Sequence, residues 1–281
     1  MRFIQNNKLQ SKGHDMYETN YHRASSVDDA LALFKKGSDS KYLAGGHTLL
    51  PVMKQRLAQP SDVIDIAKIP GMSGVSVAGD ALVIKAATTY YDIMTSKDAA
   101  KAIPAIVHLT SVLGDPAVRY RGTIGGSIAN NDPAADFPAA ILALDATVKT
   151  NKRSIKAGDF FKGLFTTALE DGEIITEVSF PIPAKAAYAK MRHPASRFAL
   201  TGVFVAKTKS GEVRVAATGA SQNGVMRVPD IEKALTAKWS ADAIEPVKIS
   251  ANGMMEDIHG TSEYRANLVK VMAQHAVSAA G

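Results

Sequence analysis

Cysteine is absent from this chain of 281 residues. Its absence excludes disulfides, thiolate nucleophiles, Cys-ligated zinc and Cys-ligated iron–sulfur clusters within the chain. The seven histidines are scattered and do not have the spacing of metal ligands, and His-Glu-x-x-His does not occur. We therefore predict no metal site on this polypeptide.

Long apolar runs are also missing. No stretch approaches the roughly 20 apolar residues that a membrane span needs. Residues 1–15 are polar and lack the apolar core of a secretory leader, so we predict a disordered extension there. Together with the absence of cysteine, this favours a cytoplasmic protein.

Clusters of positive charge and of aromatic residues are likewise few. The formal net charge is +6, but Lys and Arg are spread along the chain, and aromatic residues make up only 6% of it. A nucleic-acid-binding module usually concentrates basic residues and stacking side chains on one surface. A nucleic-acid-binding function is therefore disfavoured. Part of the positive charge is available to face an anionic cofactor or an acidic partner.

The order of apolar patterns and turn signals predicts an α+β protein of two domains. The prolines at Pro181 and Pro183 mark the boundary, which gives domains over residues 16–183 and 184–281. Helices are predicted at 26–36, 49–57, 90–94, 98–102, 103–113, 137–144, 229–237, 241–249 and 261–278. Strands are predicted at 41–44, 63–66, 75–77, 81–84, 146–149, 173–180, 203–207 and 213–218.

Two glycine-rich segments are the strongest chemical signal. The first, Ala44-Gly45-Gly46-His47-Thr48-Leu49-Leu50-Pro51, lies between a predicted strand and a predicted helix start. Glycine allows the backbone to approach a ligand, and successive amides at a helix start favour phosphate. The alternative is an ordinary tight turn.

The second segment, Gly122–Pro133, is also rich in glycine and asparagine, and Asp136 follows it. We interpret it as a second loop of amide donors, to which Thr123 and Ser127 add hydroxyl groups. A diphosphate held between the two loops fits this pattern. The motif Gly-x-Gly-x-x-Gly does not occur after a predicted strand, so a Rossmann dinucleotide site is disfavoured. The motif Gly-x-x-x-x-Gly-Lys-Ser/Thr is also missing, so a P-loop is disfavoured.

Taken together, the two segments resemble the FAD-binding medium subunits of aerobic carbon monoxide dehydrogenases. The same pattern is found in the flavin domain of xanthine dehydrogenases and related molybdenum hydroxylases. The resemblance extends over about residues 17–278, and the segments lie about 75 residues apart, as in that family. It implies a PCMH-type FAD-binding domain of two subdomains, followed by a smaller α+β CO dehydrogenase flavoprotein C-terminal domain.

The resemblance also implies a set of FAD-binding residues and no catalytic residue. Lys190 matches a lysine near the flavin ring, where its charge is expected to stabilise reduced, anionic flavin. The implied contacts are Leu43, Ala44, Gly45, Gly46, His47, Thr48, Leu49, Leu50, Leu113, Gly114, Val118, Gly122, Thr123, Ile124, Gly125, Gly126, Ser127, Asn130, Asp136, Ile175 and Lys190.

Each assignment has a structural alternative. The apolar members Leu113, Val118 and Ile175 also suit a hydrophobic core. Asp136 suits the N-cap of a helix that begins at Phe137. Lys190 suits a solvated surface, and His47 suits a hydrogen-bonding loop position better than a general base.

The function that the resemblance implies is electron transfer within an oxidoreductase. A large molybdopterin subunit oxidises a small molecule, a small subunit passes electrons through [2Fe–2S] clusters, and FAD on this chain delivers them to an external acceptor. The family commonly forms a dimer of such three-subunit units. Relatives with an extra iron–sulfur cluster on this chain are excluded, because it has no cysteine. The alternative is a free-standing PCMH-type flavin oxidase or reductase.

Overall fold

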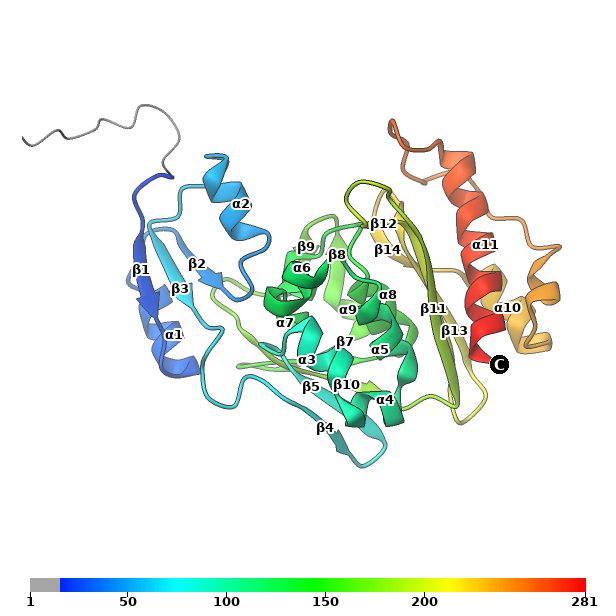
Figure 1. Ribbon diagram of the computed structural model, residues 1–281, viewed down its shortest axis with the longest axis horizontal. Helices are drawn as coiled ribbons and strands as arrows, with labels where there is room; N and C mark the ends of the chain where they lie inside the picture. Colours follow the sequence, from blue (N-terminus) through cyan, green and yellow to red (C-terminus); the bar gives the residue numbers. More distant parts are fainter. Residues whose placement is uncertain (1–15) are drawn as a thin grey trace, which may run out of the picture.

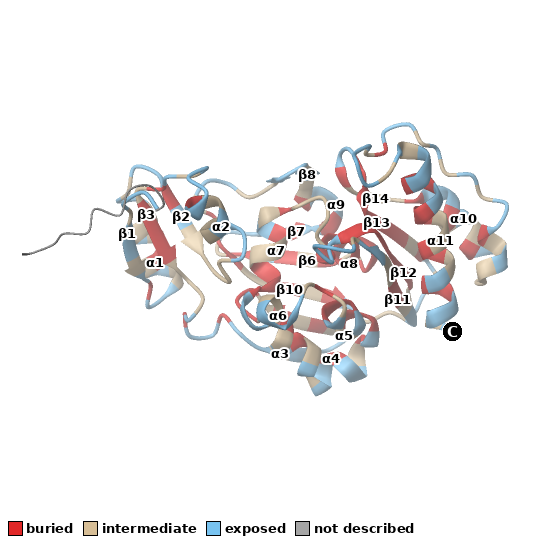
Figure 2. Cartoon of the chain, turned by 45° about the horizontal axis from the view of Figure 1, so that its top comes forward, coloured by how far each residue is buried: buried red, intermediate tan, exposed pale blue. Residues whose placement is uncertain are grey.

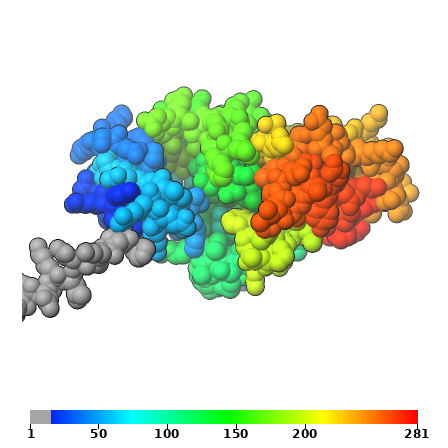
Figure 3. Space-filling view, turned by 90° about the horizontal axis from the view of Figure 1, so that it is seen from above, coloured from blue at the N-terminus to red at the C-terminus, as the bar shows by residue number. Residues whose placement is uncertain are grey.

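The computed structural model describes residues 16–281, so the predicted disordered extension, residues 1–15, lies outside the described residues. The elements form three groups that follow one another along the long axis of the molecule (Figure 1). The view from above shows the same order, from the N-terminal group through the central group to the C-terminal group (Figure 3). Each group combines helices and strands, and the predicted α+β class is confirmed.

The N-terminal group is a small parallel sheet with two helices, each of which connects one strand to the next along the chain. Its elements are β1 (Asn20–Arg23), α1 (Val27–Phe34), β2 (Ser40–Leu43), α2 (Leu49–Lys54) and β3 (Asp62–Asp65). The strand order is β1-β3-β2. Helix α1 begins after Ser26, whose hydroxyl accepts a hydrogen bond from the Asp29 amide at 3.0 Å.

The central group combines an antiparallel sheet with short helices. Its strands are β4 (Val75–Ala78), β5 (Ala81–Lys85), β6 (Thr147–Thr150), β7 (Ser154–Lys156), β8 (Phe161–Gly163), β9 (Thr166–Thr167) and β10 (Ile175–Pro181). Its helices are α3 (Tyr90–Thr95), α4 (Lys97–Ala102), α5 (Pro104–Ser111), α6 (Pro116–Arg121), α7 (Ile124–Asn130), α8 (Phe137–Ala143) and α9 (Ala157–Phe160). The main sheet has the order β4-β5-β10-β6-β7. The strands predicted at 75–77 and 81–84 pair as the hairpin of β4 and β5.

The C-terminal group is an antiparallel sheet covered on both faces. Its elements are β11 (Lys185–Arg192), β12 (Ala199–Lys207), β13 (Val213–Ser221), β14 (Gly224–Arg227), α10 (Pro229–Ala237), the 3-10 helix η1 (Ala241–Ile244) and α11 (Ser262–Ala280). Helices α10 and α11 pack on one face, and α8 of the central group packs on the other. Successive residues of β12 therefore join different cores: Val203 and Val205 join the one with α11, and Phe204 joins the central one. Figure 2 shows buried residues running through this sheet.

Hydrogen bonds join the C-terminal sheet to the segment that precedes α8. The Thr218 hydroxyl lies within hydrogen-bonding distance of two carbonyl oxygens, Pro133 at 2.9 Å and Ala135 at 2.7 Å. The Gly219 amide also donates to the Pro133 carbonyl, at 2.8 Å. Since Thr218 is fully buried, these contacts fix the position of the chain just before Asp136.

Several sequence predictions about local structure were wrong. Helix was predicted over 241–249, but only η1 forms, because Pro246, two residues after its end, cannot continue a helix. Strand β11 was missed, because its alanine-rich sequence has low strand propensity and it forms by pairing with β12. Helix α6 was missed although Asp115 caps it, with its carboxylate accepting from the Val118 amide at 2.9 Å.

Membrane-spanning helices and clusters of metal-binding side chains can be looked for in the described part of the chain. Within residues 16–281, no helix is both long and apolar enough to cross a membrane. Over the same residues, no three side chains of the metal-binding types lie close enough together to hold an ion.

We expect Thr218→Val to lower the free energy of unfolding by about 1–3 kcal/mol, because it removes the buried hydroxyl that satisfies the Pro133 and Ala135 carbonyls. Urea-induced unfolding measures this difference. Thr236→Val is the matched control, since its hydroxyl is exposed and water replaces the contact with the Glu232 carbonyl. Equal losses for the two variants contradict the interlocking role of Thr218.

Candidate cofactor site

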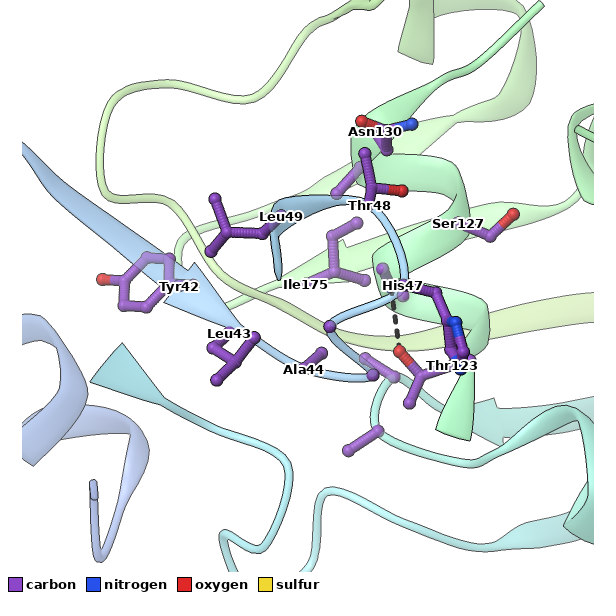
Figure 4. A pocket seen from close by; sticks show the side chains of 18 of the residues that line it. Tyr42, Leu43, Ala44, His47, Thr48, Leu49, Thr123, Ser127, Asn130 and Ile175 are labelled. Atoms are coloured by element: carbon purple, nitrogen blue, oxygen red, sulfur yellow. Dashed lines mark hydrogen bonds between the residues drawn. The ribbon is translucent and has the colours of Figure 1, made fainter. Parts of the chain in front are cut away.

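A cavity of about 720 Å³ lies where the N-terminal and central groups face each other. This volume is within the usual range for a small-molecule or cofactor site. The β2–α2 loop forms one wall, and α7 with the start of β10 forms the opposite wall (Figure 4). Phe198, from the loop between β11 and β12, also lines the cavity, so all three groups contribute to it.

The β2–α2 loop presents unpaired backbone amides. No acceptor in residues 16–281 takes the amide hydrogen of Gly45, Gly46, His47 or Thr48. The Thr48 hydroxyl is also available, because it makes no capping hydrogen bond to α2. Gly46 has a φ of +76°, a conformation that favours glycine. Consecutive free amides beside a cavity form a site for an anion, and a diphosphate fits this chemistry.

The second glycine segment is not the loop that its composition predicted. Residues 124–130 form helix α7, and the Thr123 hydroxyl caps it by accepting from the Gly126 amide at 3.1 Å. The amide of Ile124 donates to the Thr88 carbonyl and that of Gly125 to the Ala86 carbonyl. The first-turn amides are therefore already paired within the protein. This segment contributes shape and the Ser127 hydroxyl to the cavity rather than a row of free amide donors.

The two glycine segments meet backbone to backbone. A Cβ atom built on Gly45 would overlap the carbonyl oxygen of Arg121 and lie 2.8 Å from the Cα of Gly122. Gly122 is itself held by Tyr90, whose amide donates to the Gly122 carbonyl at 2.9 Å. Only glycine at position 45 allows this approach, so the contact fixes the width of the cavity.

A buried polar cluster lies at the Asp136 side of the cavity. Asp136 is 3% exposed. One oxygen of its carboxylate, Oδ1, accepts hydrogen bonds from the Tyr188 hydroxyl at 2.5 Å and from Lys190 Nζ at 2.8 Å. Burial raises the pKa of Asp136, and the Lys190 ammonium opposes that rise. Burial also raises the pKa of Tyr188, as does the charge of Asp136. Asp136 makes no capping hydrogen bond to α8, so the N-cap alternative is not supported.

A second buried carboxylate, Glu173, belongs to the lining of the cavity. Burial by itself would raise the pKa of Glu173, but hydrogen bonds from Arg153, from the Glu170 amide and from Thr150 lower it to about 2. The ionised form is therefore the stable form, and it fixes the turn that leads into Ile175 of the cavity wall.

The structure gathers most of the residues that the sequence singled out. The predicted residues that line the cavity are Leu43, Ala44, Gly45, Gly46, His47, Thr48, Leu49, Leu113, Val118, Gly122, Thr123, Gly125, Gly126, Ser127, Asn130, Asp136 and Ile175. The core and ligand-contact interpretations of Leu113 and Ile175 are compatible, because both are buried and both line the cavity.

Four predicted residues do not line the cavity: Leu50, Gly114, Ile124 and Lys190. Ile124 is fully buried in the core, and the φ of +53° at Gly114 suits the turn before α6. The Lys190 side chain is 1% exposed and pairs with Asp136, so the solvated-surface alternative is wrong. A direct effect of Lys190 on a flavin stays a prediction.

Sequence reasoning missed several lining residues, among them Tyr42, Ala86, Ala87, Tyr90, Glu173 and Phe198. Tyr90 is the most informative, because its ring occupies the space that a side chain at position 122 would need. The only hint of this in the sequence is the glycine at position 122. A glycine indicates that a neighbour lies close to the backbone, but it does not identify Tyr90 as that neighbour.

A family model described as "FAD binding domain in molybdopterin dehydrogenase" matches residues 16–183. The chain belongs to this family. FAD, the cofactor predicted from the sequence, is confirmed as the family's cofactor, and the resemblance to medium subunits is likewise confirmed.

Relatives of this flavoprotein family match along nearly the whole chain. The chain is 34% identical to the carbon monoxide dehydrogenase medium chain of Hydrogenophaga pseudoflava, over 92% of this chain and 96% of the relative. It is 35% identical to the nicotine 6-hydroxylase medium subunit of Paenarthrobacter nicotinovorans, over 93% and 96%. Family members of similar length therefore act in complexes with different named substrates.

Solved structures of the family have the same fold. Reconstituted CO dehydrogenase from Oligotropha carboxidovorans superposes with a TM-score of 0.86 at 32% identity, covering 95% of this chain and 98% of that one. Quinoline 2-oxidoreductase from Pseudomonas putida 86 gives a TM-score of 0.84 at 27% identity, with the same coverage. The predicted fold, an FAD-binding flavoprotein of this type, is confirmed.

We expect Gly45→Ala to weaken FAD binding by at least about tenfold, because the added methyl group pushes the β2–α2 loop away from Arg121 and Gly122. Titration of the FAD-free chain with FAD, followed by flavin fluorescence, measures the dissociation constant. Gly158→Ala is the matched control, since a Cβ there meets nothing within 4 Å. Unchanged affinity in Gly45→Ala contradicts the backbone contact as the determinant of the site.

We expect Glu173→Gln to lower the free energy of unfolding by about 2 kcal/mol at pH 7, because the buried carboxylate accepts charged hydrogen bonds from Arg153. The folded-state pKa of about 2 is below the ordinary value of 4.5. The contribution is therefore complete above about pH 4.5 and is lost as the pH falls towards 2.

Urea unfolding of both proteins between pH 7 and pH 2.5 checks this, and the difference between them should shrink as the pH falls. Glu170→Gln is the control, because Glu170 is a surface carboxylate with a similar partner set and should have a much smaller effect. A difference that does not change with pH contradicts the assignment to Glu173.

Proposed function

We propose that this chain is the FAD-carrying electron-transfer subunit of a heteromeric molybdenum hydroxylase or dehydrogenase. The observation that carries the proposal is the row of unpaired amides from Gly45 to Thr48, which faces α7 across a cavity of cofactor size. Electrons come from the [2Fe–2S] clusters of a partner subunit and leave FAD for an external acceptor. The chain is therefore a subunit of an oxidoreductase and not the subunit that binds the oxidised substrate.

The residues present fit FAD. The free amides of the β2–α2 loop and the Thr48 hydroxyl would hold the diphosphate, and the Ser127 hydroxyl would contact it from α7. Leu43, Leu49 and Ile175 supply an apolar wall for the rings. Bound FAD supplies one-electron and two-electron redox chemistry. The chain itself binds and orients the cofactor, and the cavity wall excludes water from it.

The partners follow from the family. The relatives are named as medium chains or medium subunits, and such a chain works with a large molybdopterin subunit and a small iron–sulfur subunit. The absence of cysteine agrees with iron–sulfur clusters on another chain. We further propose a dimer of heterotrimers in the cytoplasm, with an FAD-binding domain over residues 16–183 and a C-terminal domain over residues 184–281.

A free-standing flavin oxidase or reductase is the second candidate. It requires a substrate site within this chain, next to the flavin. The relatives that match over more than nine-tenths of the chain are named as a medium chain and a medium subunit, which favours the electron-transfer function. A nucleic-acid-binding module has no such support, since the basic residues are scattered along the sequence.

A stopped-flow experiment tests the proposal. The iron–sulfur subunit of the same complex is reduced with dithionite, freed of excess reductant and mixed with the FAD-loaded chain. We expect the flavin absorbance to bleach as the clusters are reoxidised, because the chain accepts electrons from that subunit. Flavin that stays oxidised when mixed with the reduced iron–sulfur subunit, but bleaches when a small organic substrate is added to the chain alone, supports the free-standing enzyme instead.

A further inference from the structure

The Lys190 side chain is buried and has two protein acceptors. Its Nζ lies 2.8 Å from Asp136 Oδ1 and 3.1 Å from the carbonyl oxygen of Arg197. These acceptors belong to different parts of the molecule. Asp136 is on the cavity wall before α8, whereas Arg197 is in the loop that joins β11 to β12.

The β11–β12 loop, residues 193–198, holds an unusual backbone conformation. Arg197 has a φ of +61°, which is uncommon for a residue with a side chain and costs free energy unless its surroundings hold it there. The loop is closed by the His193 amide, which donates to the Phe198 carbonyl at 2.9 Å. At its end the loop presents Phe198, which is 51% exposed and also lines the cavity.

We propose that Lys190 is a positioning residue that ties the cavity wall to the β11–β12 loop and so holds Phe198 at the cavity mouth. The anchor end is rigid, because Asp136 is buried and the preceding carbonyls are held by Thr218. The ammonium, with three donors, can serve both acceptors at once. Phe198 then covers part of the bound flavin. This covering rests on the proposed FAD site, whereas the link from Lys190 to Asp136 and Arg197 does not.

A second side-chain contact links the same loop to the segment before α11. His193 Nε2 lies 3.2 Å from His259 Nδ1, in the segment before α11. The loop therefore has an inner attachment through Lys190 and an outer one through His193. The inner attachment is nearer to Phe198 in sequence and involves a charge, so we assign the placement of the aromatic ring to it.

Limited trypsin digestion tests the tie in the full chain, with and without FAD. In Lys190→Met, cleavage after Arg197 should be about tenfold faster or more, because the loss of a hydrogen bond from a charged donor raises the population of the open loop by that factor. Iodide quenching of the bound FAD should increase in Lys190→Met and in Phe198→Ala, since both uncover the flavin.

Tyr188→Phe is the matched control, because it removes the other hydrogen bond to Asp136 Oδ1 and leaves the contact with Arg197. It should cleave and quench like the unaltered chain. The double variant Lys190→Met/Asp136→Asn removes both charges and should still cleave fast after Arg197.

Three results overturn the proposal. They are equal cleavage in Lys190→Met and Tyr188→Phe, normal cleavage in the double variant, or a uniform increase at every tryptic site in Lys190→Met. Because cleavage is also measured without FAD, these outcomes are separate from a failure of the chain to bind FAD. Fast cleavage with no FAD uptake leaves the tie intact and contradicts the proposed function.

Discussion

The close contact of Gly45 with the backbone of Arg121 and Gly122 is the constraint on which the cofactor site depends. It joins the N-terminal parallel sheet to the central group at a point where no side chain fits. The loop lies against the second glycine segment and lines the cavity, and its amides find no partner in the described chain. Unpaired amides beside a cavity favour an anion, and this is the basis of the proposed diphosphate site.

The C-terminal group completes the site by burying the other end of it. Its sheet is apolar on both faces, so it packs on α8 as well as on α11. This packing brings Tyr188 and Lys190 of β11 onto the carboxylate of Asp136. A buried carboxylate without such partners would be protonated or would destabilise the fold. The C-terminal group is therefore part of the environment of the cofactor and not only an attachment to it.

The second glycine segment shows where composition misleads. Glycine, serine and asparagine predict a loop, but the segment is not one. The capping hydroxyl of Thr123 and the buried side chains of Ile124 and Ile128 stabilise a helix instead. Helix propensity is a weak preference that packing can override, and a glycine at 125 is required because the helix lies against Ala86. The structure places the segment beside the cavity, its conformation differs from the predicted loop, and its contact with FAD stays a prediction.

The sequence by itself determined the family, the cofactor, the absence of an iron–sulfur cluster on this chain and the two segments that build the site. These depend on residue types, such as glycine where the backbone must approach and cysteine where a cluster must bind. Only the tertiary structure decided which amides stay free, and that Lys190 pairs with Asp136 rather than facing solvent or the cavity. Hydrogen bonds and ion pairs between residues far apart in the chain depend on distances of a few ångströms, and the order of residues does not contain those distances.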